Sequence, residues 1–384
     1  MRILGTYIDK TLALFRPIIV QNNVIGLYGM NHNVSLKYAP QLDGLRGAAI
    51  LAVMAYHSGA PFCQGGFIGV DVFFVLSGFL ITTSLMEEYQ RNGSVILRNF
   101  YFRRILRLMP ALLFLLIVFS LSSIIFLEKS ETLYNLVDAC MTLFYVSNWA
   151  RVFGIHAPYY LGHSWALSLE VQFYILWPPL LFLILRNPKS NSYIFNIFII
   201  ASLAALSVWV VRFLLLTSGS LPRRIYNGLD TRIDSFLVGA ILATVRSFLF
   251  RHRWLMLPFL SVMAPLSAGG LVVLAFYARW RSYQMAFYLY SVVEICSAIV
   301  ILDLLYNTRS LLRRVLCMKW LVWIGTLSYG LYLWHYPVYV AMWNLGFQWL
   351  GMITYGSLLT LFVATFSFYI LERRFLVLAK GFRK

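Results

Sequence analysis

The sequence is organised in apolar blocks of about twenty residues separated by short polar connections. The blocks lie at 42–60, 69–87, 108–127, 132–150, 165–185, 194–216, 230–248, 255–277, 284–305, 321–345 and 350–371. A helix of this length crosses the hydrocarbon core of a bilayer and satisfies its own backbone hydrogen bonds, for which lipid offers no partners. The blocks lack the two-residue alternation that is typical of porin-like barrels. The pattern therefore predicts an all-α integral membrane protein.

The composition agrees with this class. Hydrophobic residues make up 60% of the chain and charged residues only 12%, against about 25% charged in soluble domains. The formal charge of +18 could suggest a nucleic-acid partner, but Lys and Arg lie in the short connections, where positive charge fixes membrane orientation. The expected partner is thus the lipid bilayer and not nucleic acid. The four cysteines lie far apart without a CxxC or Cys/His pairing, which argues against a disulfide framework or a zinc site.

The basic connections predict the topology. The connection 88–107 and the tail 373–384 are both rich in arginine, so both should face the cytoplasm. Nine blocks separate them, whereas an even number of crossings is needed, so one block does not cross. The block 132–150 is the most polar because it contains Asn135, Asp138 and Asn148. We therefore expect it to be re-entrant or interfacial, which leaves about ten transmembrane helices.

With ten spans, 23 Lys and Arg residues fall on the cytoplasmic side and 6 on the outer side. This bias predicts that both termini are cytoplasmic. Residues 1–41 lack the clean apolar core and the cleavage site of a signal peptide. The expected organisation is an N-terminal cytoplasmic extension at 1–41, a membrane domain at 42–372 and a basic cytoplasmic tail at 373–384.

Arg46 and His57 are the only basic side chains in the segment LDGLRGAAILAVMAYH. They are eleven residues apart, which is close to three turns of α-helix, so both should project from one face roughly 16 Å apart. This spacing is typical of a lined passage and not of a surface patch.

Further arginines lie in the run FYFRRILRLMP. Helical spacing places Arg103 and Arg107 on one face with Arg104 beside them, and Arg46 is expected at the same side of the membrane. Guanidinium groups make bidentate contacts with phosphate, so these arginines predict that an anionic ligand binds on the cytoplasmic side of the membrane domain. The alternative is that these arginines only anchor the loop to anionic lipid head groups.

Ionisable side chains also gather towards the outer side. They are His57, Asp71, His163, Glu170, Arg232, Asp234 and His335. Such groups are costly within a membrane and usually face a cavity or a partner. Each alone could be a satisfied structural residue, but together they predict a site in which a histidine acts as general base. No metal is predicted.

Six separated motifs follow one another along the chain. They are LDGLRG with its Arg-x10-His spacing, GFIGVDVFFVLSGFLIT, FRRILRLMPA, HSWALSLEVQFYILWP, TRIDSFLVGAILA and IGTLSYGLYLWHYPV. In these motifs, over roughly residues 38–372, the chain resembles the acyltransferase-3 family of membrane acyltransferases. That family carries acyl groups from cytoplasmic acyl-CoA to an acceptor on the far side of the membrane.

The resemblance implies roles for the matching positions. Arg46 would support the donor, His57 would be the catalytic base, and Glu170 fills the acidic position of the fourth motif. The arginine-rich loop with Arg103, Arg104 and Arg107 would hold the CoA phosphates. Further polar candidates within the motifs are Asp43, Asp71, Ser77, His163, Arg232, Asp234 and His335.

The implied activity is O-acyl transfer, most simply acetyl transfer. Acetyl-CoA would be the donor, and a hydroxyl of a carbohydrate or glycolipid, such as a surface polysaccharide or lipopolysaccharide, would be the acceptor. The implied location is a plasma membrane, as in the inner membrane of a bacterium. No SGNH hydrolase-like domain of the kind fused to some relatives is seen, so the chain is expected to act as a stand-alone core or with separate partners.

The chain departs from the family pattern at a few positions. Val171 follows Glu170 where a second acidic residue is common, Ala166 replaces a common serine, and Glu372 precedes arginine instead of proline. These changes weaken any role for a second carboxylate and leave Arg46 and His57 intact.

Two other functions stay open on the sequence. A transporter or flippase for an anionic solute or a lipid-linked sugar would also place Arg, His and Glu inside the membrane. Transporters often contain inverted repeats, and none is visible in this sequence. A non-catalytic scaffold is the third possibility, and the intact Arg46 and His57 pair argues against it.

Overall fold

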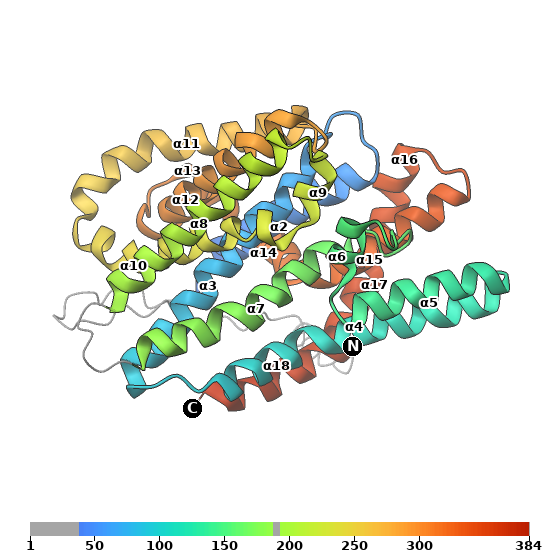
Figure 1. The fold of residues 1–384 in the computed structure, drawn as a ribbon, viewed down its shortest axis with the longest axis horizontal. Helices are drawn as coiled ribbons and strands as arrows, with labels where there is room; N and C mark the ends of the chain where they lie inside the picture. The colour runs from blue at the N-terminus through green and yellow to red at the C-terminus, as the bar shows by residue number, and fades with distance from the viewer. Residues whose placement is uncertain (1–37, 187–192, 384) are drawn as a thin grey trace, which may run out of the picture. The chain divides into compact units, whose positions relative to one another are not determined.

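The computed structural model describes residues 38–186 and 193–383. All regular secondary structure in these ranges is helical, which confirms the predicted all-α class. Most of the extension predicted at 1–41 lies outside the described residues. Many of the long helices run side by side, as Figure 1 shows for α3, α7 and α8.

The helices fall into an N-terminal and a C-terminal series. The first series is α2 (Pro40–His57), η1 (Gly66–Ile68), α3 (Gly69–Asn92), α4 (Leu97–Phe126), α5 (Lys129–Leu143), α6 (Ser147–Phe153), α7 (Ser164–Leu185), α8 (Tyr193–Thr217), α9 (Pro222–Asn227) and η2 (Leu229–Thr231). The second is α10 (Asp234–Arg251), α11 (Arg253–Tyr277), η3 (Met285–Leu289), α12 (Tyr290–Tyr306), α13 (Leu311–Leu316), α14 (Lys319–Thr326), α15 (Ser328–Asn344), α16 (Trp349–Gly351), η4 (Met352–Gly356), α17 (Ser357–Ser367), η5 (Phe368–Glu372), α18 (Arg373–Lys380) and η6 (Gly381–Arg383).

Seven helical segments in the described ranges are long and apolar enough to cross a membrane. They are Gly66–Asn92, Leu97–Phe126, Ser164–Leu185, Tyr193–Thr217, Arg253–Tyr277, Met285–Tyr306 and Trp349–Lys380. The other three blocks predicted to cross form α2, α10 and the pair α14 and α15. These are also helical, but they are shorter or more polar, so the total of ten crossings stays a prediction.

The block predicted to be re-entrant or interfacial does not form one long helix. It is divided into α5 and α6, with Tyr145 between them at a φ of 54°. Helix α5 folds back against α4, as Figure 1 shows. At 30 residues, α4 is about 45 Å long, which exceeds the roughly 30 Å of a bilayer core.

Helix α2 packs against α3, α14 and α15. Its approach to α13 and α14 depends on glycines. A Cβ added at Gly44 would lie 1.7 Å from the carbonyl oxygen of Leu316. A Cβ added at Gly47 would lie 2.3 Å from the carbonyl oxygen of Leu321. The backbones can therefore approach more closely than any side chain would allow, and this fixes the helix that carries Arg46.

Gly325→Ala tests this close approach from the side of α14. The new Cβ would lie 1.8 Å from the backbone oxygen of Asp43, and this backbone cannot swing away as a side chain could. We expect a loss of about 1 to 3 kcal/mol in unfolding free energy, as for other overpacked sites. Thermal unfolding of purified variants is the measurement. Gly269→Ala in α11 is the matched control, because nothing lies within 4 Å of its Cβ position, and a gain or no loss is expected there. Equal stability of the two variants would contradict the close-packing account.

Candidate active site

Helix α2 contacts α15 through both Arg46 and His57. Arg46 Nε donates to Ser328 Oγ at 3.3 Å. His57 Nδ1 lies 3.0 Å from His335 Nε2. Both side chains of α2 therefore face α15, as their helical spacing predicts.

The histidine pair has a definite proton arrangement. The Leu331 carbonyl can only accept, so His335 Nδ1, 3.0 Å away, carries the hydrogen of that bond. In a neutral ring, His335 Nε2 is then an acceptor, and His57 Nδ1 must donate to it. The chain of bonds leaves His57 Nε2 as the unprotonated nitrogen. This is the arrangement that a general base requires.

A third histidine completes an aromatic cluster. The ring centroid of His163 lies 5.4 Å from that of His335 and 5.1 Å from that of Tyr336, on which it stacks. The Tyr336 ring also meets His57 edge-on at 4.9 Å. The Tyr332 hydroxyl donates to the backbone oxygen of His163 at 2.8 Å. The cluster thus joins α2, α15 and the start of α7.

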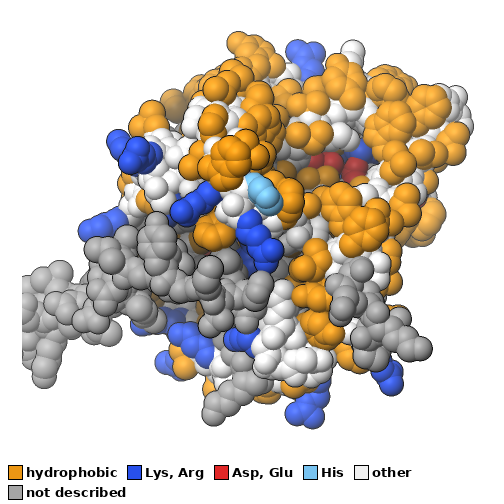
Figure 2. All heavy atoms as spheres, turned by 90° about the vertical axis from the view of Figure 1, so that its left-hand side faces the viewer, with side chains coloured by type: hydrophobic (Ala, Val, Ile, Leu, Met, Phe, Trp, Pro, Cys, Tyr) orange, Lys and Arg blue, Asp and Glu red, His pale blue; other side chains and the backbone are white. Residues whose placement is uncertain are grey.

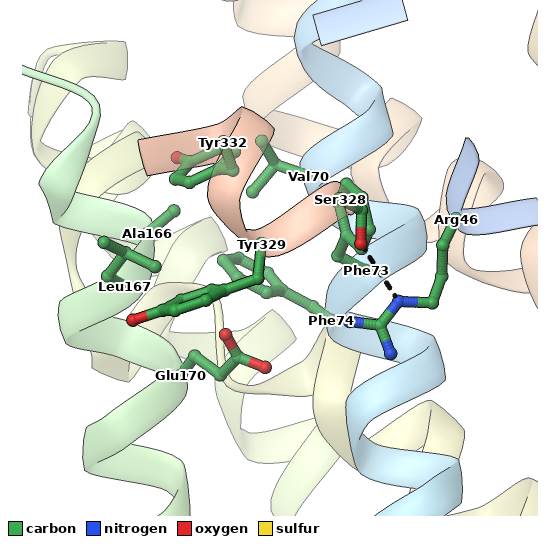
Figure 3. A pocket seen from close by; sticks show the side chains of 10 residues that line it. All are labelled: Arg46, Val70, Phe73, Phe74, Ala166, Leu167, Glu170, Ser328, Tyr329 and Tyr332. Atoms are coloured by element: carbon green, nitrogen blue, oxygen red, sulfur yellow. Dashed lines mark hydrogen bonds between the residues drawn. The ribbon is translucent and has the colours of Figure 1, made fainter. Parts of the chain in front are cut away.

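A small cavity lies between Arg46 and Tyr332, whose ring contacts His163 and His335 in this cluster. Its walls come from α2, α3, α7 and α15 (Figure 3). The lining residues are Arg46, Val70, Phe73, Phe74, Ala166, Leu167, Glu170, Ser328, Tyr329 and Tyr332. Figure 3 places the Arg46 guanidinium and the Glu170 carboxylate towards one end and Tyr332 at the other. Since Tyr332 contacts His163, the cavity leads from the charged end to the histidines.

Glu170 is held by neighbours from two helices. Its Oε1 accepts from Ser77 Oγ at 2.7 Å and from the Tyr174 hydroxyl. The carboxylate is also within electrostatic reach of Arg46 and Arg104. Ser77 and Glu170 therefore belong to the charged end of the cavity, and Tyr174 joins them as a residue that the sequence did not indicate.

The arginines predicted in a loop lie in helix α4 instead, and they divide into two groups. The Arg104 guanidinium lies 4.9 Å from the centre of the Tyr174 ring, and Arg107 interacts electrostatically with both Arg46 and Arg104. Arg103 instead donates to the Phe382 carbonyl at 2.6 Å and pairs with Glu88 at 3.2 Å. The cavity end thus gathers Arg46, Arg104 and Arg107, whereas Arg103 contacts the C-terminal segment.

Figure 2 looks onto the side of the molecule where α10 ends and α11 begins. Lys and Arg side chains stand there among apolar ones, and a hollow in this face contains acidic and basic side chains. His252 lies at the junction of the two helices, where its Nδ1 is 3.0 Å from the Phe248 carbonyl oxygen. It takes no part in the histidine cluster.

The remaining predicted ionisable residues form a separate buried network. Arg232 pairs with Asp71, and Arg212 pairs with Asp234. The Arg232 guanidinium lies 3.6 Å from the centre of the Tyr290 ring. The structure therefore divides the group predicted near the outer side into three parts: the histidine cluster, this ion network, and Glu170, which lies with Arg46 at the charged end of the cavity. Sequence reasoning passed over Arg212 and Glu294 here, although any ionisable residue within an apolar block is a signal.

Asp43 does not line the cavity, although its carboxylate is within electrostatic reach of Arg46. It lies in the first turn of α2, where a carboxylate is favoured by the helix dipole, and it hydrogen-bonds Tyr38. Its backbone oxygen is the atom that faces Gly325. In this structure Asp43 therefore acts at the start of α2 and not at the cavity.

The segment before His163 is tied to α5. Asp138 Oδ2 accepts from the Tyr159 backbone N–H at 3.0 Å, and Oδ1 pairs with His156 Nε2. Burial raises the pKa of Asp138, while these hydrogen bonds act in the opposite direction. The contacts fix the segment that ends at His163, so α5 helps to position the histidine cluster.

A family model described as an acyltransferase domain matches residues 40–372. The chain belongs to the acyltransferase-3 family. Membership confirms the resemblance found in the six motifs and places the chain among multi-pass membrane proteins. No solved structure gave a significant match.

Several O-acetyltransferases are similar in sequence to this acyltransferase-3 chain. The peptidoglycan O-acetyltransferase OatA of Listeria monocytogenes is 37% identical over 318 residues, which are 79% of this chain and 50% of the relative. The O-acetyltransferase OatA of Staphylococcus aureus is 36% identical over 320 residues, 80% of this chain and 51% of the relative. The putative peptidoglycan O-acetyltransferase YrhL of Bacillus subtilis is 34% identical over 370 residues, 90% of this chain and 56% of the relative. The chain spans about half the length of these relatives.

Two departures from the acyltransferase-3 pattern, Ala166 and Glu372, are connected with the cavity or its arginines. Ala166 lines it. Glu372 is buried, accepts from Ser367 Oγ at 2.9 Å and interacts electrostatically with Arg107. Within the described ranges, no group of three or more His, Cys, Asp and Glu side chains is arranged to hold a metal ion.

Proposed function

We propose that the chain is a membrane O-acetyltransferase that moves an acetyl group from cytoplasmic acetyl-CoA to a hydroxyl of a surface carbohydrate. The observation that carries the proposal is the cavity that runs from Arg46 and Glu170 to Tyr332, which contacts His163 and His335. The family and the names of the relatives support acetyl transfer. Peptidoglycan is the acceptor that two of those names suggest.

The donor would bind at the charged end. Arg46, Arg104 and Arg107 supply guanidinium groups that suit the phosphates of CoA. In the proposed topology this end faces the cytoplasm, where both termini also lie. Arg103 would join the donor site from its rim, after release from its partners Glu88 and Phe382. The pantetheine arm would then extend along the cavity towards His57, over a helical rise of roughly 16 Å.

The chemical step needs one base. His57 Nε2 takes the proton of the acceptor hydroxyl while the hydroxyl oxygen forms a bond to the thioester carbonyl carbon. The carbon–sulfur bond breaks, and the CoA thiolate leaves and is protonated. His335 holds the His57 ring in the tautomer with a free Nε2. Direct transfer and transfer through an acylated enzyme both use this base, and trapping of an acyl-histidine in a stopped reaction would count against the direct route.

The deciding experiment uses the full chain in proteoliposomes with acetyl-labelled acetyl-CoA and a disaccharide fragment of peptidoglycan. Label is expected to appear on the disaccharide with wild type and not with His57→Ala. Movement of labelled solute by both proteins without acylation would instead support a transporter. Labelling of other surface glycans but not of peptidoglycan fragments would retain the activity and correct the acceptor.

The donor site gives a separate expectation. Arg46→Ala and Arg104→Ala should each raise the KM for acetyl-CoA about 10- to 100-fold, because a hydrogen bond to a charged group contributes roughly 1.5 to 3 kcal/mol. Initial rates over a range of acetyl-CoA concentrations give the value. Arg309→Ala, at an exposed position in a connection that the topology also places in the cytoplasm, is the matched control. If all three variants changed KM equally, general surface charge and not a donor site would explain the effect.

A further inference from the structure

His163 is a buried histidine with no well-formed hydrogen bond at either ring nitrogen in the described chain. The residue is only 2% exposed, and the Leu333 backbone is a polar group near the ring that could serve as a weak partner. Tyr332 binds the backbone oxygen of His163 and not its ring. A buried polar group without a partner is costly, so an imidazole in this position is suited to a ligand that supplies the missing partner.

The elements packed around His163 indicate the side from which such a ligand would reach it. His163 caps the start of α7 and follows the segment that α5 holds in place. Arg151 of α6 donates to the backbone oxygen of Gly162 at 2.9 Å, and its buried Nε has no partner in the described chain. The donor cavity ends at Tyr332, on the other side of His163. His163 therefore lies beyond the donor cavity, towards the end of the molecule formed by these connections.

Polar and aromatic groups continue in this direction at the surface. The Tyr159 hydroxyl donates to Asn344 Oδ1 at 2.9 Å, and Asn344 Nδ2 donates to the Tyr160 hydroxyl at 2.8 Å. Tyr159 and Asn344 are exposed. Aromatic faces beside amide and hydroxyl groups match the apolar faces and the hydroxyls of a sugar. They are less suited to an acyl chain, which offers no hydrogen bonds.

We propose that His163 and the rim formed by Tyr159, Tyr160 and Asn344 make up the acceptor subsite, in which His163 hydrogen-bonds a sugar hydroxyl and so holds the acceptor against His57. This inference rests on the proposed transferase function. A neutral imidazole offers one donor and one acceptor, and neighbouring hydroxyls of a sugar can match both. His57 takes the proton of the reacting hydroxyl, while His163 positions the acceptor.

The test measures the kinetics of the His163→Phe variant while the concentration of each substrate is varied in turn. Phenylalanine keeps an aromatic ring stacked on Tyr336 and removes both ring nitrogens. With the peptidoglycan disaccharide as probe, the kcat/KM for the disaccharide should fall roughly 10- to 100-fold, while the KM for acetyl-CoA changes far less. His163→Gln restores a donor and an acceptor and should recover part of the loss. His252→Phe, at the histidine outside the cluster, is the matched control and should behave as wild type.

The outcomes separate this inference from the function on which it rests. Thermal unfolding should show His163→Phe to be at least as stable as wild type, because it removes two unsatisfied buried atoms. If that variant does not fold, the comparison of His163→Gln with wild type decides. An unchanged kcat/KM for the disaccharide, or a loss in kcat alone with both KM values unchanged, overturns the acceptor role. Absence of transfer by wild type overturns the proposed function, and the subsite with it.

Discussion

His57→Gln is expected to reduce kcat for acetyl transfer by about 10²- to 10⁴-fold, the usual contribution of a positioned general base. Glutamine can still bond His335, so the contact between α2 and α15 is retained. It has no nitrogen that can take a proton near neutral pH. The transfer rate at saturating acetyl-CoA and disaccharide measures the effect.

Binding of acetyl-CoA should survive this change, because the proposed phosphate ligands lie about three helical turns away on α2 or in α4. A direct titration of His57→Gln with acetyl-CoA tests that separation of roles. His252→Gln is the matched control for a histidine outside the cluster and should leave kcat unchanged. A kcat for His57→Gln within a few-fold of wild type would remove His57 from the chemical step.

The helical architecture could be predicted because the bilayer permits few alternatives. A block that must satisfy its backbone without water becomes a helix, and each of the predicted blocks is largely helical where the structure describes it. Asn135, Asp138 and Asn148 predicted a re-entrant or interfacial block, and this stays a prediction; the break between α5 and α6 at Tyr145 was not predicted. The division of the last block but one into α14 and α15 was not predicted, although Gly325, Thr326 and Ser328 mark that junction.

The site could be predicted only along single helices. Helical periodicity put Arg46 and His57 on one face, and both contact α15. The bond from His57 to His335 joins positions 278 apart in the chain, and such a pairing depends on how α2 and α15 pack. The same limit explains why Arg103 was grouped with Arg104, although its bonds to Glu88 and Phe382 hold it elsewhere.

Packing also separates groups that the sequence treats alike. Asp71 and Arg232 were grouped with the histidines on the sequence, yet they pair with each other and do not line the cavity. Val70 lines the cavity while the adjacent Asp71 faces the ion network. Adjacent residues on a helix point about 100° apart, so α3 contributes one residue to the cavity and the next to the ion network. The network can thus hold α3 against α10 without contributing to the chemistry.

Removal of one partner from this network should be strongly destabilising. Asp71 and Arg232 are 1% and 0% exposed, and Arg232→Met would leave the Asp71 carboxylate buried without its counter-charge. We expect a loss of about 3 to 5 kcal/mol in unfolding free energy, measured by denaturant unfolding in detergent micelles. Arg224→Met is the matched control: Arg224 bonds Asp230 through two oxygens at 3.0 and 2.5 Å.

The two pairs differ in exposure and not in chemistry. The Arg224 and Asp230 side chains are 26% and 40% exposed, so water can replace the lost partner and the expected loss is below about 1 kcal/mol. The double variant Asp71→Leu with Arg232→Met removes both buried charges and should recover much of the stability lost in Arg232→Met. Such recovery would identify the uncompensated charge as the cause. Equal losses of unfolding free energy for Arg232→Met and Arg224→Met would contradict this explanation, because the loss would then not depend on how deeply the ion pair is buried.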